Sequence, residues 1–182
     1  MLQIRVKKPR HHWPLNPAEA RLAGVFVIII GAVILLSTQI RVPHLVHEIA
    51  LFGHLCCLLI GFGSVLAVDW FGLLFLARQM SMGAVLVQAH RMTPMIWLGL
   101  LGLVGTGMFL RPDLTSSLVV VKLCCVLGIS VVGALTLATK RQMVHRVADL
   151  PRRLMLRGMI LASASQALWW TAVVIGFHSA RR

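Results

Sequence analysis

The sequence predicts an all-α polytopic membrane protein, a bundle of five transmembrane helices. Of its 182 residues, 58% are hydrophobic and only 13% are charged, whereas soluble domains average about half apolar and a quarter charged. The apolar residues are gathered in five long runs separated by basic segments. Roughly 20 helical residues cross a bilayer core, and the ten-residue alternation typical of a membrane β-barrel is missing. These observations exclude a disordered chain, a disulfide scaffold and an ordinary soluble enzyme.

The first two runs differ in length. The first has 19 uncharged residues after Arg21 and predicts a helix at 22–40. The second continues beyond Asp69 to Arg78 and is longer than one bilayer thickness. Because a helix absorbs such a mismatch cheaply by tilting, we expect one long tilted helix at 45–77.

The remaining runs predict three more spans. The stretch 80–90 is too short and too close to arginines to cross the membrane, so we expect the third helix at 92–110. The fourth, at 116–139, contains a single charge, Lys122, and the fifth lies at 157–178.

The distribution of Lys and Arg predicts the orientation, since short cytoplasmic loops are the basic ones. The N-terminal segment and the loops after the second and fourth helices carry most of the 18 basic residues. We therefore expect residues 1–21 to form a basic cytoplasmic segment and 22–178 a single transmembrane domain with an external C-terminus. The net charge of +13 then serves orientation. The expected partner is the lipid bilayer and not nucleic acid.

Ionisable side chains inside a span cost about 2.5–3.5 kcal/mol on insertion scales, so each requires an explanation. His47 and His54 are seven residues apart and share one face of the second helix. Lys122 enters the fourth helix from the same outer side. The three predict an outer-leaflet pocket in which a neutral imidazole binds haem or a transition metal. Alternatively, Lys122 reaches outward to water and His54 bonds to a neighbouring helix.

Asp69 is expected near the inner interface, where an acid either pairs with an arginine or takes part in proton or cation movement. Arg78 and Arg91 are the pairing candidates. On a regular helix Arg78 lies about 13 Å from Asp69, which excludes direct contact within that helix. The partner is therefore expected from another segment, either Arg91 or the basic loop after the fourth helix.

Small residues predict how the helices pack. Gly99, Gly102 and Gly105 form a flat stripe on the third helix, suited to close approach within the chain or in a homo-oligomer. The cysteine pairs 56–57 and 124–125 are expected to fill the core. A copper site that combines them with a neighbouring histidine is the alternative.

Three features from the second helix onward occur in a fixed order. A His-bearing helix ends at an arginine (His54 to Arg78), and a Gly-rich helix then leads to a Pro-containing loop (MIWLGLLGLVGTGMFLRPDL). The next helix opens on Lys-Leu (VVVKLCCVLGISVVGALTL). Over residues 44–178 this order resembles a loose group of bacterial membrane proteins. The group includes the copper-resistance protein D domain, the membrane-bound haem-dependent protoporphyrinogen oxidase and several uncharacterised families. The sequence pattern is most similar to that of the uncharacterised families.

The resemblance implies a four-helix core with the first helix outside it, in a bacterial-type inner membrane. It also implies haem b. A histidine and a lysine bind this haem or lie beside it; the histidine corresponds here to His54 or His47, and the lysine to Lys122. The spacing from His54 to Arg78 is longer than in the oxidase, and the polar residues of its last helix are missing. The resemblance is therefore applied to the architecture and not to the oxidase activity.

Two functions follow from the sequence. The first is a multi-pass integral membrane protein that binds haem or a metal through the outer-leaflet pocket. The second is a non-catalytic membrane subunit or small-solute carrier without a cofactor, acting alone, as a homo-oligomer or in a membrane complex. The sequence contains no phosphate-binding glycine loop, nucleophile elbow or carboxylate pair, so no motif predicts an enzyme.

Overall fold

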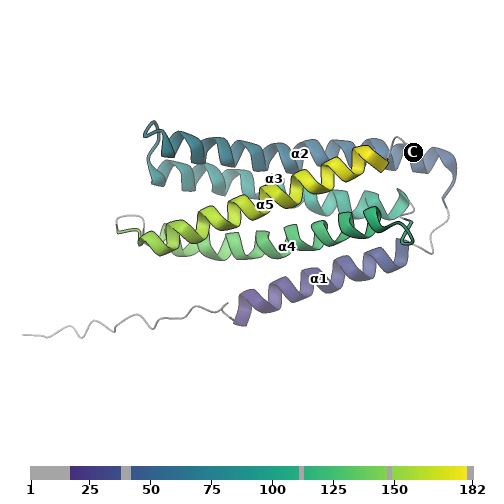
Figure 1. Cartoon of the computed structure of the whole chain (residues 1–182), viewed down its shortest axis with the longest axis horizontal. Coiled ribbons are helices and arrows are strands. Elements are labelled where there is room, and N and C mark those ends of the chain that lie inside the picture. Colours follow the sequence, from purple (N-terminus) through teal and green to yellow (C-terminus); the bar gives the residue numbers. More distant parts are fainter. Residues whose placement is uncertain (1–16, 38–41, 111–112, 147–148, 180–182) are drawn as a thin grey trace, which may run out of the picture.

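The computed structural model describes residues 17–37, 42–110, 113–146 and 149–179. The long elements in these ranges are helices that lie side by side as a bundle (Figure 1). They are α1 (Pro17–Ser37), α2 (His44–Leu76), α3 (Met82–Gly107) with the 3-10 turn η1 (Met108–Leu110), α4 (Ser117–Val144) and α5 (Arg152–Ser179). The predicted all-α membrane bundle is confirmed, because α2 to α5 are each long and apolar enough to span a membrane.

α1 takes the place of the first predicted helix. It begins at Pro17, a residue favoured at the first helical position because its missing N–H needs no partner there. Its described apolar part is Val27–Ser37. The end of the predicted helix, at 38–40, and most of the predicted N-terminal segment, at 1–16, lie outside the described residues.

α2 is the single long helix that the sequence predicts, but α3 begins ten residues earlier than expected. Ser81 caps it by accepting a hydrogen bond from the Ala84 N–H at 3.3 Å. His90 and Arg91 are exposed on this first part of α3. They interrupt the apolar run without interrupting the helix, because hydropathy reports what enters lipid and not where a helix starts. α4 and α5 extend beyond their predicted bounds for the same reason.

α2 packs most closely against α3, and α4 against α5, so the chain forms two hairpins whose backbones approach each other closely at few points. α1 lies mainly against α4. In the α2–α3 hairpin, Gly61 faces Gly99, and a Cβ added at Gly99 would overlap the Gly61 backbone and lie 2.7 Å from the Cys57 carbonyl oxygen. The Cys57 thiol packs against Gly102. Two of the three predicted stripe glycines are therefore used within the chain.

The core lies between the two hairpins. Its buried side chains come from all four spanning helices, and they are Phe62, Val65, Leu100, Leu103, Ile129 and Trp169. The rings of Phe62 and Trp169 stack with their centroids 5.5 Å apart. Trp169 is only 2% exposed, so α5 supplies the central side chain of the bundle.

The bundle has two ends that differ in charge. The α2–α3 turn, the α4–α5 turn and the start of α1 lie at one end (Figure 1), named the Arg78 end here. The start of α2, η1, the start of α4 and the end of α5 lie at the other, the His44 end. The α2–α3 turn, the end of α4 and the start of α5, which belong to the basic segments of the topology argument, thus share the Arg78 end with the start of α1. That this end is cytoplasmic stays a prediction of the charge pattern.

The turn at the Arg78 end is a Schellman cap. The Arg78 N–H donates to the Phe75 carbonyl, and the Gln79 N–H donates to the Leu74 carbonyl, each at 2.9 Å. Arg78 itself has φ 60°, in the left-handed region where this motif usually has glycine. The helix end is therefore well hydrogen-bonded but carries backbone strain at one residue.

Candidate functional site

His54 of α2 is held by a side chain of α3. Its Nδ1 lies 3.0 Å from Oγ1 of Thr106, and this hydroxyl donates its own proton to the Gly102 carbonyl at 2.6 Å. Because the hydroxyl proton is committed, Nδ1–H of His54 is the donor in the first bond. The lone pair of the neutral imidazole is therefore on Nε2.

His47, seven residues before His54 on α2, is hydrogen-bonded in a similar way nearer the His44 end. Its Nδ1 lies 3.3 Å from the carbonyl oxygen of Phe109 in η1, which accepts the proton and leaves the lone pair on Nε2. Both imidazoles thus lie on the face of α2 that meets α3 and η1, and the predicted shared face is confirmed. His44 is exposed and lies 3.5 Å from the carboxylate of Glu48 on the same helix.

Lys122 is half-buried on α4 and lies close enough to His54 for the two side chains to interact electrostatically. α2 and α4 do not pack directly against each other. Among the described residues no carboxylate forms an ion pair with Lys122. The structure therefore brings His54 and Lys122 together across the bundle, with the ammonium lacking a protein counter-ion there.

A metal-ion site made only of side chains is not present in the part of the chain that the structure describes, where no three His, Cys, Asp or Glu residues are grouped. The four cysteines are free thiols. Cys125 is buried, and Cys57 packs around the core. The core-filling role is confirmed for these two residues. No group of three ligands among the described residues supports the copper alternative.

Asp69 is paired with an amide and not with an arginine. Its carboxylate accepts a hydrogen bond from the side-chain Nε2 of Gln166 on α5, whereas Arg78 and Arg91 are both exposed. The expected pairing with Arg78 or Arg91 is therefore corrected. The physical reason is that α2 meets the middle of α5 at this level. The sequence feature that could have identified Gln166 is a side-chain amide within an otherwise apolar run.

A cavity of about 120 Å³ lies beside this pair, between α2, α3, α4 and α5. Asp69 and Lys140 both line it. Lys140 donates to the Thr93 hydroxyl at 2.5 Å, and this hydroxyl donates to the Ala89 carbonyl at 2.6 Å. Lys140 was not predicted as a site residue, because its position directly after the fourth apolar run is typical of a basic loop.

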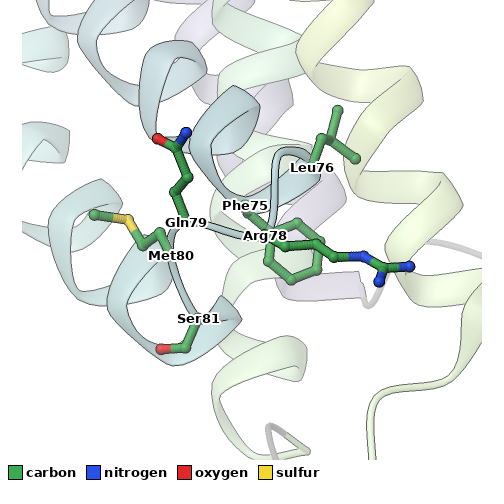
Figure 2. Close-up of a pocket in the computed structure, with 6 residues that line it drawn as sticks. All are labelled: Phe75, Leu76, Arg78, Gln79, Met80 and Ser81. Carbon is green, nitrogen blue, oxygen red and sulfur yellow. The ribbon is translucent and has the colours of Figure 1, made fainter.

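A second pocket lies at the surface of the Arg78 end. It is an open depression of about 550 Å³ lined by residues of the turn between Phe75 and Ser81. Figure 2 shows its polar side chains diverging: Gln79 and Ser81 lie on one side of the turn, and the guanidinium of Arg78 extends to the other. Because these groups do not converge on a common point, the pocket is a surface feature and not a candidate site.

Comparison with known proteins finds no matching family model, no similar curated protein and no similar solved structure.

Proposed function

We propose that this membrane protein binds one haem b in the half of its transmembrane domain nearer the His44 end, where His54 would hold the iron and Lys122 would balance the negative charge of the propionates. The observation that carries the proposal is the hydrogen bond from His54 Nδ1 to Thr106. Histidines that ligate metals usually donate their other ring N–H in this way, which fixes the tautomer and the ring orientation.

The available donors favour haem over a free metal ion. A structural or catalytic ion needs three or four protein ligands, and the described residues offer no such group. A porphyrin brings four nitrogen ligands of its own and takes one or two more from the protein. One anchored imidazole therefore suffices, and His47, which is anchored to Phe109, is a second candidate ligand.

The charge at Lys122 supports an anionic ligand. An ammonium inside a span is costly unless it is paired, and no described carboxylate pairs with Lys122. A haem propionate beside this lysine would neutralise it. Haem, when bound, supplies redox chemistry, while the side chains of this protein bind it, orient it and balance its charge.

The resemblance to the copper-resistance protein D and haem-dependent oxidase group supports the same residues, and the proposal extends to its setting. This setting is a bacterial-type inner membrane with a cytoplasmic N-terminus. The basic residues at the end of α4 and the start of α5, which lie at the Arg78 end with the α2–α3 turn, support the orientation.

The test is the Soret band of detergent-purified protein, as isolated and after titration with haemin. We expect His54→Ala to remove most of the bound pigment. His145→Ala, at the exposed end of α4, should leave it intact. Thr106→Val keeps the ligand but removes its anchor, and should weaken haem binding about 10- to 100-fold.

Folded protein that gives no Soret band after titration would end the haem proposal. The alternative, a non-catalytic membrane subunit or small-solute carrier without a cofactor, would then replace it. Equal pigment loss in His54→Ala and His145→Ala would also contradict a ligand role for His54, because it would show a general effect on folding.

A further inference from the structure

We infer that the cavity between the two hairpins is a binding site for a small zwitterion of the amino-acid class, carrying one ammonium and one carboxylate group. The site involves Asp69 and Lys140 and is separate from the proposed haem site. Asp69 is 15 residues from His54 along α2, about 22 Å at the helical rise per residue.

The first argument is that polar atoms without described partners occur in residues that line the cavity or lie next to it. Trp169 lines it and is 2% exposed, yet its indole N–H has no hydrogen-bond acceptor among the described residues. The buried Oε1 of Gln166, next to Asp69, has no described donor. Buried polar groups in native proteins are almost always satisfied. One open group belongs to a lining residue and the other to the partner of Asp69, so the polar groups around this cavity are not all satisfied by the described residues.

The second argument is the charge. Asp69 on α2 and Lys140 on α4 line the same cavity, but no ion pair joins them. The only described protein partners of these two groups are neutral, Gln166 for the acid and Thr93 for the base. A ligand with an ammonium near Asp69 and a carboxylate near Lys140 would satisfy both charges at once. A ligand with one charge would satisfy only one of them.

The third argument is the size. A water molecule occupies about 30 Å³ in the liquid, so a cavity of about 120 Å³ holds a ligand of about four or five non-hydrogen atoms. Glycine has this size. The remaining walls are largely apolar, including Val65, Leu100 and Ile129, which favours a ligand whose polar groups are confined to its two charged ends.

The test uses full-length protein in lipid nanodiscs and measures equilibrium binding of radiolabelled glycine by scintillation proximity. We expect saturable binding for which unlabelled leucine does not compete, because leucine exceeds the cavity. Acetate and methylammonium each carry one of the two charges and should compete at least about tenfold more weakly.

The variants assign the binding to the cavity. Asp69→Asn and Lys140→Met should each weaken glycine binding at least about tenfold. Arg141→Met is the matched control, because it removes the neighbouring basic side chain of α4, which is exposed and does not line the cavity. Size-exclusion profiles and melting temperatures verify that each variant is folded.

Absence of saturable glycine binding by the folded parent would overturn the inference and assign the open polar atoms to ordered water. Unchanged binding in folded Asp69→Asn and Lys140→Met would overturn it as well, because glycine would then bind elsewhere. Neither result depends on haem, since the haem ligands lie at the other end of the bundle.

Discussion

Gln166 of α5 donates a side-chain hydrogen bond to the carboxylate of Asp69 on α2, and the two residues are 97 positions apart in the sequence. This bond joins the α2–α3 hairpin to the α4–α5 hairpin, whose backbones approach each other closely at few points. Polar side chains serve this purpose in membranes because apolar side chains gain little from leaving lipid tails for one another.

The first prediction concerns this bond. The sequence alone suggests that Asp69→Asn destabilises the protein by leaving an arginine unpaired. The structure reverses that expectation, because the asparagine carbonyl still accepts from Gln166 and a charge is removed from the span. Asp69→Asn should therefore keep the melting temperature of the parent in the same detergent. Asp69→Ala should lower stability by about 1–3 kcal/mol, because the Gln166 amide is left without an acceptor. Equal losses in both variants would show that the charge itself is required.

The second prediction concerns the closest helix contact. Gly99→Ala should destabilise the protein by about 1–3 kcal/mol, because the added methyl group would overlap the Gly61 backbone. Gly105→Ala is the matched control on the same helix. Nothing lies within 4 Å of its added Cβ, and alanine is the better helix former. The comparison is made by thermal unfolding of both variants. A Gly99→Ala protein as stable as the parent would contradict the close approach of α2 and α3.

The third prediction concerns the strained turn. Arg78→Gly should stabilise the protein by about 1 kcal/mol, since glycine adopts a positive φ without the steric cost that other residues bear. Arg78→Ala removes the same side chain but keeps the strain, so it should give no such gain. Both variants are compared with the parent by thermal unfolding in one detergent. Equal stabilisation by glycine and alanine would assign the effect to the lost charge.

The fourth prediction concerns the orientation. A cysteine placed at Ser116, before the start of α4, should react with an impermeant thiol reagent added outside intact cells. A cysteine placed at Arg146, after the end of α4, should react only after the cells are opened. The labelling uses a background in which the four native cysteines are replaced by alanine or serine. The opposite pattern would refute the charge-based orientation.

The sequence by itself determined the class of the protein, the order of its spanning helices and the grouping of its basic segments. These follow from properties that each segment has on its own, namely its hydropathy, its length and its charge. The single long helix through Asp69 and the shared face of His47 and His54 were predictable for the same reason, because helical geometry depends only on spacing along one segment.

Only the tertiary structure decided which helices are neighbours and therefore which side chains meet. The pairing of Asp69 with Gln166, the anchoring of His54 by Thr106 and the cavity bordered by Asp69 and Lys140 each join different helices. Such contacts depend on the rotation and packing of every helix against the others, set here by close approaches such as Gly61 to Gly99. Hydropathy does not encode that rotation, because all faces of a membrane helix are apolar enough to lie against either lipid or protein.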